Sequence, residues 1–220
     1  MPQLIPRPWE ELAPKMELIL LQPTLTGAET LTGCRLAEQA GVAVVVVKPC
    51  FVRQAVHVLR GSQTTVGTVI SYPYGCQATS IKVQETKRAL TEGALVLSLP
   101  LNLGYVREGL FDLAVADLKA VVGLAHMNGA RVTVMVDFGL LTGAEWGMAC
   151  QMAVQAGVDG LSPVPGPGRV DLAEVRRAVG PDVLVKTSGP FPSLEAIEAL
   201  MGLGADRVMI YLGDLERLNS

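Results

Sequence analysis

The amino-acid sequence predicts a (β/α)8 barrel, in which eight parallel strands close into a ring that is covered by helices. Eight short β-branched runs alternate with helix-like segments along 220 residues. Half of the residues are apolar and only 18% are charged, as in many α/β proteins. Parallel strands need crossover helices, and eight such units in this length indicate closure. An open doubly wound sheet is the alternative, although no GxGxxG motif follows any of the runs.

The expected strands are short runs rich in Val, Leu and Ile, each followed by a polar or glycine-containing segment. No linker interrupts them, so we predict one domain over residues 1–220, with residues 1–15 as an N-terminal extension. In chain order the runs are Met16–Leu21, Val42–Val47, Val66–Ile70, Leu95–Leu101, Val132–Val136, Val158–Leu161, Val183–Thr187 and Arg207–Tyr211.

Seven crossover helices are expected between these strands, because apolar residues recur there at spacings of three and four. Four of the helices lead into the next strand through a glycine, which supplies the left-handed conformation that ends a helix. These glycines are Gly41, Gly93, Gly157 and Gly204. By contrast, the proline-rich segment from Ser162 to Gly168 is expected to be a loop after the sixth strand.

Charge and composition exclude several classes of protein. A formal net charge of -3 without a basic cluster argues against a nucleic-acid partner. Residues 1–15 lack the pattern of a signal peptide, and the longest apolar run, Val42–Val47, is too short to span a membrane. We therefore expect a cytoplasmic protein. The four cysteines are expected to be free, and because they form no CxxC pair we predict neither a metal site nor a cofactor.

Active sites of such barrels lie at the carboxyl ends of the strands, which leaves two of the six lysines as candidates. Lys186 near the end of the seventh strand is expected to point into the barrel mouth, where an amine suits carbonyl addition or proton transfer. Lys48 after the second strand is the other candidate. Glu17 or Asp137 is expected to pair with Lys186, and the nearby polar groups are Asn102, Thr187 and Ser188. Each lysine can instead serve a structural ion pair.

Several segments resemble the deoxyribose-phosphate aldolase family, whose members are class I aldolases with a barrel fold. The matches extend over most of the chain without large gaps, which implies the same fold and ancestry. They are Leu20-Leu21-Gln22-Pro23-Thr24 with the family's LLKPT, the segment 48–52 with YPRFV, 71–75 with GFPLG, 101–104 with INIG, 138–142 with TGLLT, 156–159 with AGAD and 185–189 with VKASG.

The resemblance implies where the family's catalytic residues fall in this chain. The nucleophilic lysine that forms the Schiff base falls on Ser162, and the aspartate that shuttles protons falls on Ser98. A second lysine of the family is retained as Lys186, and its acidic partner on the first strand as Glu17. Serine cannot form an imine, so the family's cleavage of 2-deoxyribose 5-phosphate is not expected here.

The resemblance also implies changes where the family binds phosphate. The glycine pair after the seventh strand becomes Gly189 and Pro190, and proline removes one amide donor. The serine pair after the eighth strand becomes Tyr211 and Leu212. A sugar phosphate is therefore not the expected ligand. The candidate ligand-binding residues are Gly189, Ser188, Thr187, Gly213 and Lys48, with Lys186, Glu17 and Asn102 as candidate catalytic residues.

Three hypotheses follow for function. The first is a divergent aldolase-like barrel without aldolase activity, which binds a small carbonyl or sugar-like molecule. The second is an altered lyase that uses Lys186 on a non-phosphorylated carbonyl compound. The third is a non-catalytic binding or regulatory subunit that uses exposed aromatic residues, for which Phe51, Tyr105 and Trp146 are candidates. The apolar composition also predicts a homodimer or a higher homo-oligomer.

Overall fold

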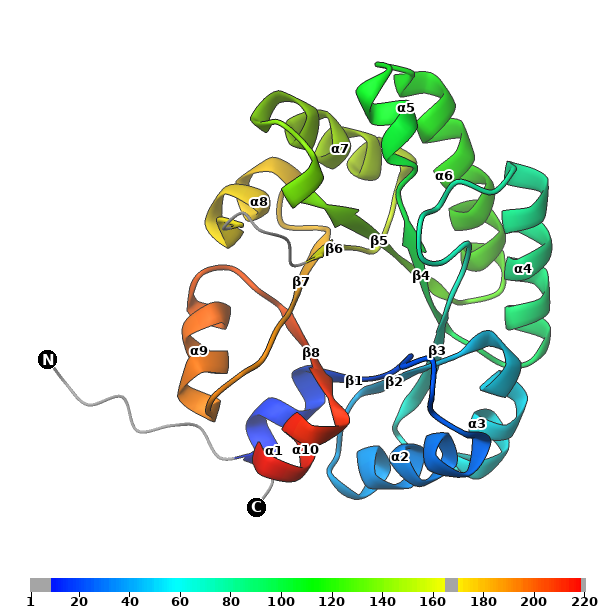
Figure 1. The fold of residues 1–220 in the computed structure, drawn as a ribbon, viewed down its shortest axis with the longest axis vertical. Coiled ribbons are helices and arrows are strands. Elements are labelled where there is room, and N and C mark those ends of the chain that lie inside the picture. Colours follow the sequence, from blue (N-terminus) through cyan, green and yellow to red (C-terminus); the bar gives the residue numbers. More distant parts are fainter. Residues whose placement is uncertain (1–8, 165–169, 219–220) are drawn as a thin grey trace, which may run out of the picture.

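A computed structural model describes residues 9–164 and 170–218 and confirms the (β/α)8 barrel (Figure 1). Eight parallel strands pair in sequence order, and the last pairs with the first, so the described sheet is closed. The strands are β1 (Met16–Leu20), β2 (Val44–Val47), β3 (Thr65–Val69), β4 (Val96–Pro100), β5 (Arg131–Asp137), β6 (Gly160–Val164), β7 (Leu184–Ser188) and β8 (Arg207–Tyr211).

Each of the seven connections between strands contains a helix, as predicted, and the helices surround the barrel in Figure 1. Capping boxes begin two of them, at Thr26 and at Thr142. The helices are α1 (Trp9–Leu12), η1 (Ala13–Lys15), α2 (Gly27–Gln39), η2 (Pro49–Phe51), α3 (Val52–Val58), α4 (Thr79–Thr91), α5 (Leu103–Arg107), α6 (Phe111–Met127), η3 (Phe138–Leu140), α7 (Gly143–Ala156), α8 (Leu172–Val179), α9 (Leu194–Gly202) and α10 (Leu212–Leu218).

The glycine junctions behave as predicted. The backbone φ angles of Gly41, Gly93, Gly157 and Gly204 are +72°, +98°, +75° and +111°. A side chain with a Cβ is disfavoured at such angles, so glycine lets each helix stop and the next strand begin within a few residues.

The sixth strand is longer than predicted, because its ladder with β5 continues to the pair Asp137 and Val164. On its other edge, β6 pairs with β7 only at Gly160 and Leu161. Pro163 has no amide hydrogen to extend that second ladder. Ser162 to Val164 thus belong to β6 and not to the expected loop, and the rest of that predicted loop, residues 165–168, lies outside the described residues.

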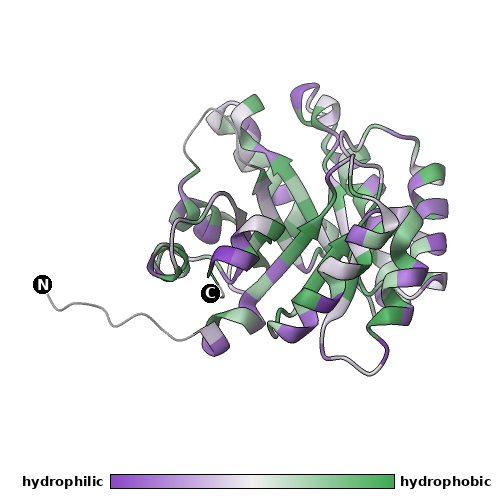
Figure 2. Ribbon diagram, turned by 60° about the horizontal axis from the view of Figure 1, so that its bottom comes forward, coloured by the Kyte–Doolittle hydropathy of each residue, from purple (hydrophilic) through white to green (hydrophobic). Residues whose placement is uncertain are grey.

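Two separate apolar layers hold the barrel. The larger lies between the strands and the helices and includes Leu18, Leu97, Val134 and Ile210. The smaller lies inside the barrel and consists of valines from β2, β3 and β4, packed with Ile19. Figure 2 shows the strands as a mainly hydrophobic centre, with hydrophilic residues concentrated on the surrounding helices. Because the inner apolar cluster covers only one side, the β5 to β8 side of the interior is free to carry polar groups.

The described part of the N-terminal extension packs against the barrel. Leu12 and Ala13 are buried, and the indole Nε1 of Trp9 donates a hydrogen bond of 2.7 Å to the carbonyl of Ala40. Arg207 at the start of β8 donates to the carbonyl of Pro14. These contacts fix the extension at the amino-terminal end of the strands.

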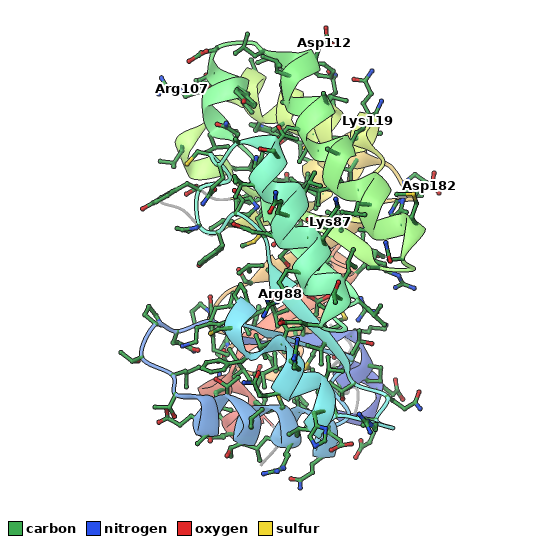
Figure 3. All side chains as sticks on the ribbon, turned by 90° about the vertical axis from the view of Figure 1, so that its right-hand side faces the viewer. Lys87, Arg88, Arg107, Asp112, Lys119 and Asp182 are labelled. Atoms are coloured by element: carbon green, nitrogen blue, oxygen red, sulfur yellow. The ribbon has the colours of Figure 1, made fainter. Side chains whose placement is uncertain are left out.

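A buried ion pair joins two outer helices. Lys82 of α4 is fully buried and its ammonium binds the carboxylate of Asp117 on α6. The same carboxylate accepts a 2.7 Å hydrogen bond from Thr79. Lys87 of α4 and Lys119 of α6, by contrast, lie on the outer surface in Figure 3. The one lysine that faces α6 is thus a structural group.

We expect Lys82→Met to lower the free energy of unfolding by about 3–5 kcal/mol, because it leaves the Asp117 charge buried without its partner. The double variant Lys82→Met/Asp117→Leu should recover most of this loss, since it removes both charges. Urea denaturation measures both values, with Lys87→Met as the exposed control. An equal loss in the single and double variants would contradict this account.

Candidate functional site

A pocket of about 290 Å³ opens at the carboxyl-terminal end of the barrel, and we call it the mouth pocket. Its lining combines apolar side chains from β1 to β3 with a set of hydroxyl and amide groups. None of the described residues that line it is a lysine or an arginine. The polar lining residues are Gln22, Tyr72, Ser98, Ser162, Ser188 and Tyr211.

Strand geometry accounts for the two serines at the base of this pocket. Successive side chains of a strand point to opposite faces, so Ser98 in the middle of β4 and Ser162 in the middle of β6 face inward while their neighbours Leu97 and Leu161 face the helices. Both serines are buried. The hydroxyl oxygen of Ser162 lies 4.0 Å from the sulfur of Met209 on β8.

Polar atoms in the mouth pocket are available to a ligand. The side-chain oxygen Oε1 of Gln22 is buried and has no hydrogen-bond partner among the described residues. Burial raises the pKa of the Tyr211 hydroxyl, and the neighbouring Tyr72 and Asp214 add to this shift. Tyr211 is therefore a neutral donor at physiological pH, and Gln22 is an acceptor that lacks a donor.

A constrained turn after β3 places Tyr72 at the pocket. Ser71 has a φ angle of +56°, which is uncommon for a residue with a side chain. Its amide donates a 2.6 Å hydrogen bond to Glu85 of α4. Gly75 of the same turn approaches β4 so closely that a Cβ would lie 2.0 Å from the carbonyl oxygen of Pro100. This strain is maintained by the surrounding contacts, as is common at binding sites.

The lysine singled out from the sequence does not reach the mouth pocket. The ammonium of Lys186 lies 2.7 Å from Oε1 of Glu17, and both side chains are buried. They line a separate cavity of about 300 Å³ at the amino-terminal end of the strands, which we call the lower cavity. The predicted pair with Glu17 is confirmed, but the expected direction of Lys186 is wrong. Glu17 is the second residue of β1, so its carboxylate holds the ammonium below the mouth.

Asp137, the other acid considered as a partner, has a different role. Its carboxylate accepts a 3.0 Å hydrogen bond from the amide of Gly139 and caps η3. Asn102 likewise caps α5 by accepting from the amide of Gly104. Neither residue lines the mouth pocket or the lower cavity. Asn102 and Asp137 were expected at a catalytic site because each follows a predicted strand. Their side chains instead cap the helices that begin after them.

Lys48 is a structural lysine in this arrangement. Its ammonium donates hydrogen bonds to the carbonyl groups of Gln22, Pro23 and Leu25, at 3.2, 3.3 and 2.6 Å. It also lies 5.4 Å from the centre of the Phe51 ring. Lys48 thereby fixes the loop after β1, whose Gln22 lines the mouth pocket.

Only one of the remaining candidate ligand-binding residues lines the mouth pocket. That residue is Ser188, the last residue of β7. Thr187, Gly189 and Gly213 lie beside it along the chain but are not among the described lining residues. Thr187 precedes Ser188 in the strand and has the opposite direction, as the alternation of a strand requires.

The carboxyl end of β8 is already occupied by an acidic side chain. The amide of Tyr211 donates a 3.2 Å hydrogen bond to Asp214 of α10, and the same carboxylate pairs with Arg217 at 2.9 Å. An anion at this point would meet an amide that already donates to Asp214, beside a carboxylate that is paired with Arg217. The sequence pattern did not predict this role, because it depends on how α10 turns back over β8.

The aromatic candidates for a partner surface are half-buried. Tyr105 and Trp146 pack against the main core, and the ring of Trp146 lies 5.5 Å from that of Phe138. Phe51 packs against Gly27 and Lys48. His57 lies in α3 and His126 in α6, and His126 binds Asp159. Core packing thus accounts for these aromatic residues.

Within residues 9–164 and 170–218, no group of three or more histidine, cysteine or acidic side chains is arranged to hold a metal ion. No helix in the same ranges is long and apolar enough to cross a membrane.

Comparisons with known proteins agree with this architecture. No protein-family model matches the chain. It is 36% identical over 203 residues to a deoxyribose-phosphate aldolase of Geobacillus sp. (strain WCH70), covering 90% of each chain, and 34% identical to one of Lysinibacillus sphaericus (strain C3-41), covering 90% of this chain and 91% of the relative. A solved structure described as a putative deoxyribose-phosphate aldolase from Coccidioides immitis has a TM-score of 0.87 at 27% identity, covering 97% of this chain and 86% of the other.

All four cysteines are free, and we expect only two of them to react in the folded protein. Burial raises the pKa of Cys34 to about 11 and that of Cys150 to about 12, so both stay protonated at pH 8. Cys50 and Cys76 are exposed. Alkylation with iodoacetamide at pH 8 should therefore add two groups, as read by intact mass, and four after denaturation. Rapid addition of four groups to the folded chain would contradict this burial.

Proposed function

Because the chain belongs to the deoxyribose-phosphate aldolase family, we propose that it is an aldolase-like barrel without Schiff-base activity. In this proposal the mouth pocket binds a small uncharged carbonyl or sugar-like molecule. The observation that carries it is the position of Ser162, which lies buried in the mouth pocket on β6 with no lysine among the described lining residues. An imine requires an amine at the reacting carbon, and a serine hydroxyl cannot supply it.

The other catalytic position supports the same conclusion. Ser98, where the family resemblance places the proton-shuttling aspartate, is also buried in the mouth pocket. A serine has no carboxylate to move a proton during carbinolamine formation. Two separate chemical functions are thus replaced by hydroxyl groups that face the same space.

The alternative lyase that uses Lys186 is less well supported. The ammonium is held by Glu17 at 2.7 Å, and both groups line the lower cavity rather than the mouth pocket. The amine that would have to add to a carbonyl is instead engaged in this ion pair.

The lining of the mouth pocket supports an uncharged ligand. The hydroxyl groups of Ser98, Ser162, Ser188 and Tyr211 can donate or accept, and Gln22 offers an acceptor without a partner. No described lining side chain is cationic, and Asp214 occupies the end of β8. These features favour hydroxyl and carbonyl groups over phosphate.

We propose a cytoplasmic location for this protein. The four free cysteines support a cytoplasmic location, where thiols stay reduced. We also propose that the chain forms a homo-oligomer. One structural neighbour, from Aeropyrum pernix, is described as a tetrameric deoxyribose phosphate aldolase.

We expect no Schiff-base adduct when the protein is treated with acetaldehyde and sodium borohydride, because none of the described residues that line the mouth pocket carries an amine. Intact mass should show no stable alkylation, and cleavage of 2-deoxyribose 5-phosphate should not exceed the background rate. The variant Ser162→Lys should gain a trapped adduct on the new lysine, with Ser162→Met as the control for the change in size.

If the wild-type protein gives an adduct, proteolytic mapping identifies which lysine carries it. An adduct on wild-type protein that maps to Lys186 would overturn the loss of Schiff-base chemistry and support the altered lyase. Adducts on Lys87 or Lys119 would show only surface modification, because both lie on outer helices.

We further expect 2-deoxyribose to bind at least about tenfold more tightly than its 5-phosphate, since no described lining side chain is cationic and the Tyr211 amide at the end of β8 already donates to the carboxylate of Asp214. Isothermal titration calorimetry at low salt measures both constants. Asp214→Asn should reduce the difference, because asparagine keeps an acceptor for the Tyr211 amide but removes the charge. Tighter binding of the phosphate to the wild type would contradict the proposed ligand class.

A further inference from the structure

The lower cavity has the composition of a binding site that is independent of the mouth pocket. It is bounded by the first residues of six strands, at the end of the barrel opposite the mouth pocket. Its volume of about 300 Å³ is enough for roughly ten water-sized groups. The polar side chains that line it are Glu17, Gln63, Thr65, Arg131, Thr133, Lys186 and Arg207, together with Asp159.

The buried carboxylate of Glu17 is only partly satisfied. Its Oε1 pairs with Lys186 at 2.7 Å and lies 3.9 Å from Nε of Arg207. Its Oε2 is buried and has no hydrogen-bond partner among the described residues, although only 1% of Glu17 is exposed. A buried carboxylate oxygen without a donor costs free energy, so the cavity calls for a hydrogen-bond donor at this point.

Positive charge exceeds negative charge in the same cavity. Lys186 is neutralised by Glu17, and Asp159 is used by His126 and by the amide of Val132, at 2.9 and 2.7 Å. Arg131, at the start of β5, makes no ion pair with any described residue. Arg207 lies 3.9 Å from Glu17 and donates one hydrogen bond of 3.2 Å from Nη1 to the carbonyl of Pro14. The guanidinium of Arg131 and the remaining donors of Arg207 are thus available to an anion, for which their planar arrangement is well suited.

We infer that the lower cavity binds a small organic anion that carries a hydroxyl group, of the 2-hydroxycarboxylate class. The hydroxyl donates to Oε2 of Glu17, and the carboxylate is held by Arg131 and Arg207. A structural role alone would explain the pair of Lys186 and Glu17, as is usual at this end of a barrel. It would not explain an unsatisfied oxygen beside two guanidinium groups in a space of this size.

Isothermal titration of the full chain with a matched ligand series tests this inference. D- and L-lactate and glycerate have both the hydroxyl and the carboxylate, whereas propionate lacks the hydroxyl and propane-1,2-diol lacks the charge. We expect a hydroxycarboxylate to bind at least about tenfold more tightly than propionate and the diol, as expected when a charged hydrogen bond is lost. The inference would be overturned if no member of the series binds. It would also be overturned if propionate or inorganic phosphate binds as tightly as the hydroxycarboxylates.

Variants locate the binding. Arg131→Gln should weaken hydroxycarboxylate binding about tenfold or more, and because Arg131 is exposed at the start of its strand the variant should remain folded. Arg177→Gln, on the exposed face of α8, is the matched control and should bind like the wild type. Unchanged binding in Arg131→Gln would place the ligand elsewhere and overturn the inference. It would leave the proposed function of the mouth pocket unaffected, since Arg131 does not line that pocket.

Discussion

The ion pair between Glu17 and Lys186 determines how the interior of this barrel is divided. It joins β1 to β7 across β8 inside a closed sheet, where both side chains are almost fully buried. Removing one partner of such a buried pair strongly destabilises the folded protein, because the other charge stays buried without compensation. The pair therefore constrains the positions of β1 and β7. Because Glu17 is near the start of β1, the pair draws the lysine toward the amino-terminal end, and none of the described residues that line the mouth pocket is cationic.

The two sides of the interior have different chemistry as a result. Valines of β2, β3 and β4 fill one side, while β5 to β8 contribute serine, threonine, glycine and charged residues. Gly160 on β6 leaves space beside the lysine side chain, since a Cβ at this position would lie 3.4 Å from Cε of Lys186. The polar side therefore forms two compartments, a neutral mouth pocket above and a charged lower cavity below.

Family membership and altered chemistry are compatible in this protein. The barrel, its glycine junctions and the strained turn at Ser71 are properties of the scaffold, and relatives with over 30% identity share the chain over most of its length. Reaction chemistry depends on far fewer atoms. In the proposed function, the hydroxyl groups of Ser98 and Ser162 keep the mouth pocket polar in place of the carboxylate and the amine of the family.

The sequence by itself determined the eight strands and the helical crossovers, because these follow from local periodicity and from glycines such as Gly157 that end helices. It also predicted the partner of Lys186. The direction of that lysine, the capping roles of Asn102 and Asp137, and the carbonyl contacts of Lys48 were decided only by the tertiary structure. A strand pattern specifies which face a side chain points to, whereas its height within the barrel depends on where the nearest opposite charge or carbonyl lies after closure.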